Sequence, residues 1–358
     1  MGSVSHEQRV GVAVVGIGGW GKNLARNFAE LPGAFLKYVC DLEPKRCAEF
    51  AARYPTTTPT GDIDRVLGDP EVRALVIATT GPTHFAIARQ ALEAGKDVLV
   101  EKPFVLHSAE AHTLIELAEA QGRILMVGHL LEYHPVVNRL REMVERQDLG
   151  QLRYIYSQRL NLGTVRGDEN AMWNFAPHDI SAILHILGRE PSDVAARGQS
   201  YLKKGVEDVV FVTLNFGDAA LAHIHVSWLD PHKIRRLTLV GSQKMAVFDD
   251  LEPAEKLKIY DKGVDVNTEY RSYAEYVSLR FGDITIPHIR MTEPLRIECE
   301  HFLECVRERR TPRTDGWNGL RVVRILEAAQ ESLLQNGRPV ALGQALRRFG
   351  KPVGVGAA

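Results

Sequence analysis

The sequence predicts an α/β protein with two domains, in which a doubly wound parallel sheet is followed by an α+β domain with a large, mainly antiparallel sheet. Three observations predict this fold class. The chain has 358 residues, which is more than one small core needs. Its first third alternates short β-branched runs with helical patterns. After about residue 130, longer runs of alternating polarity are joined by turns. We therefore expect domains at residues 8–130 and 131–350.

The N-terminal strands are expected at short runs rich in β-branched residues. These runs are Val10–Val15, Phe35–Cys40, Ala74–Ala78, Asp97–Val100 and Ile124–Val127. Between the first two, Leu24, Phe28 and Leu31 recur at the i, i+4, i+7 spacing of a helix face. Another apolar face ends before Gly95. Each strand is thus expected to return through a helix, which makes the sheet parallel.

The second domain is expected to contain a broad sheet with a few helices. Its predicted strands are Leu152–Leu160, Val194–Leu202, Asp208–Phe216, Ala220–Trp228 and Ile234–Val240. A helix is predicted over Pro177–Leu187, with Pro177 in its first turn and Gly188 as its stop. Two more helices are predicted near Leu295–Arg309 and Gly319–Gln335.

Composition excludes several classes of protein. The 44 Lys and Arg residues balance 45 Asp and Glu residues without a long run of one sign, which argues against nucleic acid and anionic membranes as partners. The four cysteines lack C-x-x-C spacing and indicate reduced core thiols. No stretch approaches the ~18 apolar residues of a membrane helix, and no metal motif such as H-E-x-x-H occurs. We expect a cytoplasmic protein without a metal.

A glycine-rich motif follows the first predicted strand and opens a helix. It reads Gly16-Ile17-Gly18-Gly19-Trp20-Gly21. Asp41 ends the second predicted strand 20 residues after Gly21, which is the spacing of a Rossmann dinucleotide unit. Gly16 would allow the tight turn, Gly18 would let the backbone approach a pyrophosphate, and Gly21 would permit close packing. The helix N-terminus would favour the phosphate charge.

Asp41 predicts which dinucleotide binds. Its carboxylate would accept hydrogen bonds from the ribose hydroxyls and repel a 2′-phosphate, so we expect NAD rather than NADP. The alternative is a plain strand-to-helix turn followed by a solvated loop acid. That alternative requires the glycine pattern and the acid spacing to coincide by chance.

Lys102 is a candidate for proton transfer. The run Val100-Glu101-Lys102-Pro103 ends a strand at the carboxyl edge of the sheet, where ligands of such folds lie. Oxidising an alcohol requires a base within reach of the hydroxyl, and burial beside a nicotinamide cation would favour the neutral amine. Glu101 would favour the ammonium, which could polarise a carbonyl in the reverse reaction. The alternative is a surface lysine paired with Glu101.

These motifs together resemble the glucose–fructose oxidoreductase/inositol dehydrogenase (Gfo/Idh/MocA) family over nearly the whole chain. They are the Rossmann fingerprint, the Glu101-Lys102-Pro103 turn, the mostly β second domain, and the run Ala78-Thr79-Thr80-Gly81-Pro82-Thr83-His84. The resemblance implies an NAD(P)-dependent oxidoreductase that acts on CH–OH groups, with Lys102 reaching both nicotinamide and substrate. The cofactor contacts that it implies are Gly16, Ile17, Gly18, Gly19, Trp20, Gly21, Asp41, Thr79, Thr80, Pro82, His84, Glu101, Lys102, Pro103, His129 and Trp173.

The resemblance also implies that a histidine of the second domain assists Lys102. The family carries an aspartate-x-glycine-x-histidine motif there, which corresponds to Asn174-Phe175-Ala176-Pro177-His178. His178 thus inherits the histidine role, while Asn174 and Ala176 depart from the pattern and remove a carboxylate near the site. In the first turn of the predicted helix, His178 would be kept neutral by the macrodipole and so be available as a base. The alternative is a capping or core histidine, as we assume for His185.

Two stretches resemble one branch of the family, the bacterial UDP-N-acetyl-glucosaminuronate 3-dehydrogenases. They are residues 163–180 and 128–135. This likeness implies oxidation of the C3 hydroxyl of a nucleotide-linked sugar. Arg166 could pair with a carboxylate or diphosphate, and Asn170 and Asp179 could bind sugar hydroxyls or an acetamido group. The expected substrate contacts are Lys102, Arg166, Glu169, Asn170, Trp173, His178 and Asp179. A solvated Arg166–Glu169 pair and simple core packing of Trp173 are the alternatives.

Two other functions remain open. One is a dehydrogenase of a free sugar or cyclitol, including a 3-ketosugar reductase. The other is a non-catalytic NAD-sensing regulator, against which the presence of both Lys102 and His178 argues. A broad sheet with one uncovered face also predicts a homodimer or homotetramer, as is common in the family.

Overall fold

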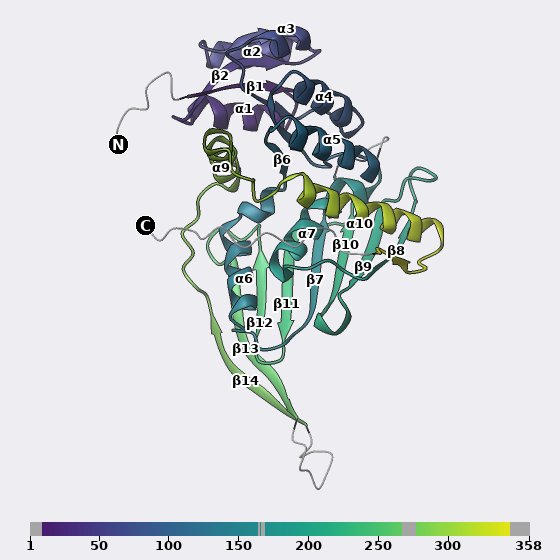
Figure 1. Cartoon of the computed structure of the whole chain (residues 1–358). Coiled ribbons are helices and arrows are strands. Elements are labelled where there is room, and N and C mark those ends of the chain that lie inside the picture. The colour runs from purple at the N-terminus through teal and green to yellow at the C-terminus, as the bar shows by residue number, and fades with distance from the viewer. Residues whose placement is uncertain (1–8, 164, 166–168, 267–276, 344–358) are drawn as a thin grey trace. The chain divides into compact units, whose positions relative to one another are not determined.

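The chain folds into two compact units (Figure 1). The computed structural model describes residues 9–163, 165, 169–266 and 277–343. The first unit contains residues 9–133 and returns at Thr292–Arg324. The second contains the described parts of His134–Met291 and residues 325–343. The first unit is therefore built from two stretches that lie far apart in the sequence.

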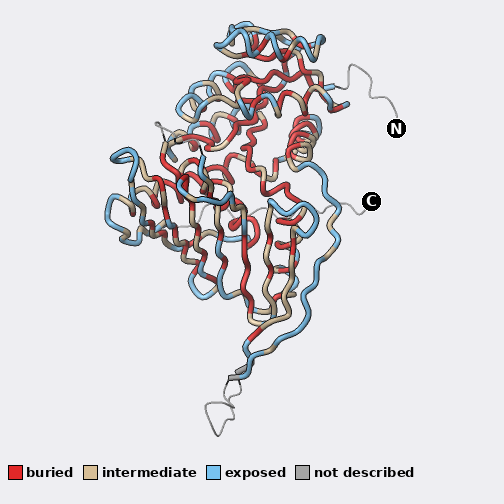
Figure 2. The backbone as a smooth tube through the Cα atoms, turned by 180° about the vertical axis from the view of Figure 1, so that it is seen from behind, coloured by how far each residue is buried: buried red, intermediate tan, exposed pale blue. Residues whose placement is uncertain are grey.

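A six-stranded parallel sheet forms the centre of the first unit, with the strand order β3-β2-β1-β4-β5-β6. Its strands are β1 (Val10–Val15), β2 (Ala34–Cys40), β3 (Thr58–Thr60), β4 (Ala74–Ile77), β5 (Asp97–Glu101) and β6 (Leu125–Gly128). Every residue of β1, β4 and β5 is buried, as expected of strands covered on both faces. Figure 2 shows these strands as buried. The predicted doubly wound sheet is confirmed, with β3 as an additional edge strand.

Helices cover both faces of this sheet and form two separate hydrophobic cores. They are α1 (Gly21–Glu30), α2 (Pro44–Arg53), α3 (Ile63–Gly68), α4 (Gly81–Glu93), α5 (Ser108–Ala120), η2 (Leu130–Tyr133), α9 (Pro294–Glu308) and the start of α10 (Gly316–Leu334). One core includes residues of α1, α2 and α9, where Phe28 meets Phe302 edge to face with the ring centroids 6.3 Å apart. The other includes residues of α3, α4, α5 and α10.

A nine-stranded sheet forms the second unit, with the order β14-β13-β12-β11-β7-β10-β9-β8-β15 among the described residues. Only the β7–β10 pairing is parallel, which confirms the mainly antiparallel prediction. Its strands are β7 (Leu152–Leu160), β8 (Asp193–Gln199), β9 (Val209–Asn215), β10 (Leu221–Ser227), β11 (Ile234–Gly241), β12 (Met245–Asp249), β13 (Leu257–Val266), β14 (Val277–Thr285) and β15 (Val340–Ala341). Its other elements are α6 (Pro135–Glu145), α7 (Ala171–Leu187) and η3 (Gly217–Ala219).

Helix α7 differs from its prediction. It begins at Ala171 rather than Pro177, because the side chain of Asn170 caps it by accepting the backbone N–H of Trp173 at 3.1 Å. Pro177 lies inside the helix, and Gly188 ends it in the left-handed conformation (φ 63°), as predicted. His178 therefore lies about two turns from the start. The macrodipole therefore does not keep this imidazole neutral, contrary to the prediction, since its effect fades beyond the first turn.

The four cysteines are free and buried, which confirms the prediction of reduced core thiols. Within the described ranges, no helix has both the length and the apolar character needed to cross a membrane. The same residues contain no group of three or more His, Cys, Asp or Glu side chains arranged to hold a metal ion.

Candidate active site

The candidate residues of the first unit gather at one edge of its parallel sheet. Strands β2, β1, β4, β5 and β6 are neighbours, and their carboxyl ends lie in register, with Val15 opposite both Cys40 and Ile77 and Glu101 opposite Gly128. Every cofactor contact predicted in this unit lies at the end of one of these strands, in the loop that follows it or in the first turn of the next helix. Ligands of open parallel sheets bind at this edge, near the point where strand order reverses between β1 and β4.

The glycine loop between β1 and α1 is closed on one side and open on the other. A Cβ atom on Gly21 would lie 1.7 Å from the carbonyl oxygen of Gly16, and one on Gly16, which has φ +90°, would lie 2.7 Å from the backbone of Ala78. At Gly18 and Gly19 an added Cβ would meet nothing within 4 Å. The loop therefore packs tightly against the sheet and leaves room above Gly18 and Gly19, which fits a bound pyrophosphate.

Asp41 joins the end of β2 to this loop. Its Oδ2 accepts the backbone N–H of Ile17 at 2.7 Å, and its Oδ1 accepts that of Glu43 at 2.9 Å. Arg46 lies 3.6 Å from Oδ1. Each carboxylate oxygen has further lone pairs, so Asp41 can hold the loop and still accept hydrogen bonds from ribose hydroxyls. This arrangement fits the adenosine end of a dinucleotide.

His84 connects the ends of β4 and β5. Its Nδ1 lies 2.7 Å from the carbonyl oxygen of Pro103, and its Nε2 lies 3.2 Å from that of Thr79. The ring is fully buried in α4, and burial lowers its pKa. A neutral ring donates through one nitrogen, and the shorter contact favours Pro103. His84 thus positions the turn that carries Lys102, while Thr80 and Pro82 form the start of α4.

The carboxylate of Glu101 lies buried beside Lys102. Its Oε1 accepts the indole N–H of Trp20 at 2.6 Å, and its Oε2 accepts the backbone N–H of Lys102 at 3.1 Å. Burial raises the pKa of Glu101 to about 7, against the lowering effect of Trp20 and the Lys102 charge. Lys102 is partly exposed, and the Lys102–Pro103 peptide is cis. The lysine therefore has an adjacent carboxyl group whose charge changes near neutral pH.

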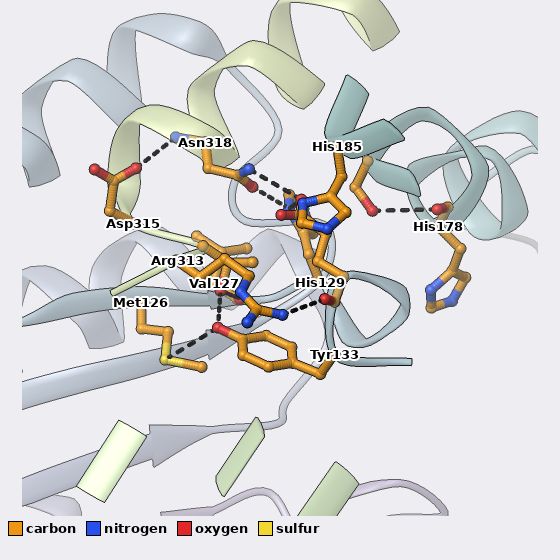
Figure 3. Close-up of polar contacts among 12 residues, drawn as sticks. Met126, Val127, His129, Tyr133, His178, His185, Arg313, Asp315 and Asn318 are labelled. Carbon is orange, nitrogen blue, oxygen red and sulfur yellow. Dashed lines mark hydrogen bonds and ion pairs between the residues drawn. The ribbon is translucent and has the colours of Figure 1, made fainter. Parts of the chain in front are cut away.

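His129 follows β6 and belongs to a buried polar network (Figure 3). Its Nδ1 lies 2.6 Å from Oδ1 of Asn318, whose amide nitrogen donates to Glu132 at 2.9 Å. Burial lowers the pKa of His129, and the charge of Lys102 lowers it further. Asn318 and Glu132 are not among the predicted site residues, and Asn318 lies 189 residues from His129 in the sequence. The network fixes the orientation of the imidazole.

In the second unit, the predicted residues lie on α7 or just before it. Asn170 donates from its amide nitrogen to Glu207 at 2.6 Å and to Gln330 at 3.0 Å. The indole of Trp173 donates to the same Gln330 oxygen at 3.2 Å. Asn170 and Trp173 are thus held by protein groups, and a substrate contact from either would have to share these partners.

Asn174, which the resemblance aligned with an aspartate, is held by two side chains. Its amide nitrogen donates to Glu169 at 2.6 Å, and its oxygen accepts the indole N–H of Trp228 at 3.4 Å. A carboxylate from the preceding loop, that of Glu169, thus contacts the Asn174 side chain. His178 is partly buried one turn further along, and its carbonyl oxygen accepts the hydroxyl of Ser181 at 3.1 Å (Figure 3).

Asp179 forms a buried ion pair. Its Oδ2 accepts from Nε of Arg159 at 2.7 Å, and its Oδ1 accepts from Nη2 of Arg159 at 3.2 Å and from the Ser157 hydroxyl at 2.5 Å. The structure therefore gives Asp179 a structural partner on β7, while its predicted sugar contact stays a prediction. Arg166 lies outside the described residues.

Two family models match the chain. The model described as "Oxidoreductase family, NAD-binding Rossmann fold" covers residues 10–129, and the GFO/IDH/MocA C-terminal domain model covers residues 137–247. The UDP-N-acetylglucosamine 3-dehydrogenase of Acidithiobacillus ferrooxidans is 30% identical, over 90% of this chain and 97% of that protein. The match thus extends over both units.

Two further relatives cover almost as much of the chain. The scyllo-inositol 2-dehydrogenase (NAD(+)) of Bacillus subtilis is 24% identical, over 94% of this chain and 97% of that protein. The crystal structure of GenD2 from gentamicin A biosynthesis, in complex with NAD, superposes with a TM-score of 0.79 at 25% identity, covering 95% of this chain and 97% of GenD2.

Proposed function

Because the chain belongs to the GFO/IDH/MocA family of oxidoreductases, we propose that it oxidises the C3 hydroxyl of a nucleotide-linked sugar with NAD⁺ as the hydride acceptor. Activity on the CH–OH group of a sugar follows from the family and its dehydrogenase members. The position oxidised and the nucleotide are the proposed part. One observation carries it: the relative with 30% identity, matched over 90% of the chain, is named for this reaction on UDP-N-acetylglucosamine.

The dinucleotide is held by the edge of the first sheet. Gly18 and Gly19 leave room for the pyrophosphate, and Asp41 accepts the ribose hydroxyls while its charge repels a 2′-phosphate. NAD is therefore preferred over NADP. When bound, NAD⁺ supplies the hydride acceptor.

The proton of the substrate hydroxyl is handled by Lys102 and His178. The hydroxyl must lose its proton as the hydride leaves carbon, and a neutral amine or imidazole can accept it. Lys102 follows β5 at the sheet edge where the dinucleotide lies, and its turn is held by His84 through Pro103. In the reducing direction, the Lys102 ammonium polarises the carbonyl oxygen. His178 occupies the position of the histidine in the family motif.

A UDP-N-acetylamino sugar uronate is the specific substrate that we propose. The stretch of residues 163–180 is similar to that of dehydrogenases that act on such uronates. Arg166 in this stretch is the cation proposed to pair with the uronate carboxylate or the diphosphate.

A spectrophotometric assay tests this substrate class. The NADH absorbance is followed with UDP-N-acetylglucosamine, its uronate, free N-acetylglucosamine and scyllo-inositol. We expect a kcat/KM at least about tenfold higher for a UDP-sugar than for either free polyol, because a diphosphate contact contributes more than ~1.4 kcal/mol. Equal or better turnover of the free sugar or cyclitol would favour the second candidate, which the inositol dehydrogenase relative supports. NAD binding without turnover of any sugar would favour a non-catalytic regulator.

We also propose that the protein is a homodimer or homotetramer assembled through the second sheet. Alternate residues of β7, β9 and β10 leave large apolar side chains on one face of the sheet, namely Tyr154, Tyr156, Phe211 and Leu221, which are between 36% and 47% exposed. Contiguous apolar surface of this kind is usually covered by another protein surface. A second copy is the partner favoured by the predominance of symmetric homo-oligomers.

A further inference from the structure

Arg235 is a cation of the second unit that forms no ion pair with a carboxylate of the described residues. It lies at the start of β11. Its Nη1 donates to the carbonyl oxygens of Leu160 and Ile234, at 2.8 Å each, and its Nη2 donates to the side-chain oxygen of Asn161 at 2.6 Å. All three acceptors are neutral. The protein therefore orients this guanidinium without neutralising its charge.

Two carboxylates act on Arg235 over a longer range, and both are bound to other cations. Asp179 is held by Nε and Nη2 of Arg159, the residue opposite Arg235 on β7. Oδ1 of Asp250 lies 3.5 Å from Nζ of Lys256. Burial and the charge of Arg159 lower the pKa of Arg235 to about 10. Arg235 thus stays charged at neutral pH, in surroundings where an added anion would be stabilised.

The Arg235 guanidinium keeps donors for such an anion. It has five N–H groups, and two on Nη1 and one on Nη2 are bonded to the acceptors above. Its Nε–H and one Nη2–H have no protein acceptor among the described residues. Arg159 holds the Asp179 carboxylate through the same two nitrogen atoms. Carboxylates and phosphates are the groups that a guanidinium binds in this way, and the partly exposed side chain of Arg235 is accessible to them.

The guanidinium lies beside the part of α7 that carries His178. Its Cζ is 5.1 Å from the ring centroid of Phe175. His178 follows Phe175 by three residues, which places the two on the same side of the helix with a rise of about 4.5 Å between them. Both are partly exposed, whereas Asn174 and Asp179 next to them are buried. Arg235 therefore stands within one helical turn of the histidine proposed to handle the substrate proton.

The proposed substrate needs more than one cation. A UDP-sugar uronate carries a carboxylate and a diphosphate, and Arg166 can pair with only one of them at a time. We propose that Arg235 binds an oxyanion of the substrate, either the carboxylate or the diphosphate, next to the hydroxyl served by His178. This inference rests on the proposed function, which places that hydroxyl beside α7. A neutral sugar would leave Arg235 without a counter-ion, so the residue selects substrates that carry an anion on the sugar.

The first experiment compares the steady-state kinetics of the wild type and Arg235→Gln. The substrates are UDP-N-acetylglucosamine and its uronate, with NAD⁺ saturating. We expect KM to rise about 10- to 100-fold, the value of a hydrogen-bonded charge contact, while kcat changes less than about threefold because the contact is made equally before and during the reaction. A rise with the uronate alone assigns the carboxylate to Arg235, and a rise with both substrates assigns the diphosphate. An unchanged KM with both would overturn the proposal.

Two further variants separate recognition of the anion from a structural effect. Arg235→Lys keeps the positive charge but loses the planar pair of donors, so its KM should lie between those of the wild type and Arg235→Gln. Arg139→Gln removes an arginine of the same unit, which lies on α6 and pairs with Glu142 at 3.1 Å in an exposed position. We expect its KM to match that of the wild type. A KM in Arg235→Lys no better than in Arg235→Gln, or an equal rise in Arg139→Gln, would contradict a charge contact at Arg235.

A second experiment needs no turnover. Isothermal titration calorimetry measures the Kd of both UDP-sugars for the NADH-bound wild type and Arg235→Gln. We expect the Kd to rise by the same factor as KM, about 10- to 100-fold, for the substrate whose anion Arg235 binds. Raising the salt concentration should weaken binding to the wild type more than binding to Arg235→Gln, because the lost contact is between charges.

The outcomes separate the two proposals. If the Kd depends on Arg235 as expected but neither sugar is oxidised, the proposed function fails and the anion contact of Arg235 stands. If the UDP-sugars are oxidised but Kd and KM are the same in Arg235→Gln, the proposed function stands and the role of Arg235 is overturned. A wild type that binds free N-acetylglucosamine or scyllo-inositol more tightly than either UDP-sugar would overturn both.

Discussion

The carboxylate of Asp41 accepts the backbone N–H of Ile17 at 2.7 Å, so the residue predicted to select the cofactor also holds the loop that is proposed to bind it. Asp41→Asn keeps an oxygen acceptor for Ile17 but removes the negative charge. We expect the NAD/NADP affinity ratio to fall about tenfold or more, because the 2′-phosphate is no longer repelled. Fluorescence titrations with NADH and NADPH measure this ratio. Asp62→Asn, at the N-cap of α3, is the control, and an unchanged ratio in Asp41→Asn would contradict the role of Asp41.

The proposed proton transfer predicts large kinetic effects at two positions. Lys102→Ala and His178→Asn should each lower kcat about 100-fold or more, the usual contribution of general acid–base catalysis. The control is Lys258→Ala, on β13, which removes a lysine paired with Glu255 at 2.7 Å. Losses of less than about tenfold at Lys102 or His178 would argue against the assigned roles.

The raised pKa of Glu101 predicts a pH-dependent stability. Because burial raises the pKa from 4.5 to about 7, the folded protein binds this proton more tightly than the unfolded chain. The resulting stabilisation is complete below about pH 4.5 and is lost as the pH rises to about 7. Relative to Glu101→Gln, the wild type should lose up to about 3 kcal/mol over this window.

Thermal unfolding of both proteins between pH 4.5 and 8 measures that difference. Glu116→Gln, on the exposed side of α5, serves as the control and should parallel the wild type. A constant difference between wild type and Glu101→Gln across the window would show that Glu101 keeps an ordinary pKa.

The buried pair of Asp179 and Arg159 predicts a loss of stability. Asp179→Ala leaves the Arg159 guanidinium without its carboxylate partner at a site where the arginine side chain is 13% exposed, so we expect a cost of about 3 kcal/mol. Replacing both residues with leucine should cost less, because no charge remains buried. Glu142→Gln, which breaks the exposed pair with Arg139, should stay within about 0.5 kcal/mol in the same thermal measurement. Equal effects of the buried and exposed changes would refute this interpretation.

The exposed sheet face predicts a change of oligomeric state. Phe211 lies on this face of β9, stacked on His225 with the ring centroids 4.3 Å apart. Phe211→Lys should place a charge in the proposed interface and shift the protein towards monomers, as measured by light scattering after size-exclusion chromatography. Leu42→Lys, at an exposed leucine of the first unit, is the control. A wild type that is monomeric at micromolar concentration would end this proposal.

Much of the first unit could be predicted because its signals are local. The glycine motif, the position of Asp41 and the Glu101-Lys102-Pro103 turn each depend on residues near one another in sequence, and parallel strands bring their carboxyl ends to one edge without further information. The Asn318–Glu132–His129 network depends on contacts between distant segments. No local pattern marks Asn318 as a partner of His129.

The start of α7 was misplaced although a local signal for it exists. Asn170 is a favoured N-cap residue and marks the observed start. Pro177 is also a common first-turn residue and is followed by an apolar face, so the sequence equally favours a helix that begins at Pro177. The tertiary contacts of Asn170 with Glu207 and Gln330 select the earlier start, and neither can be inferred from spacing. The same limitation applies to Asp179, whose carboxylate suits a sugar hydroxyl as well as it suits Arg159.

The segment Thr292–Arg324 has a consequence for biosynthesis. Phe302 of α9 completes the packing around Phe28 of α1, yet it leaves the ribosome only after strands β7 to β14 of the second sheet have been synthesised. Until then, the apolar surface around Phe28 in the nascent N-terminal stretch is exposed to solvent. Exposed apolar surface of this kind is bound by chaperones and drives aggregation. A chain truncated after residue 133 should therefore precipitate on expression, and supplying α9 from a permuted N-terminus should keep it in solution.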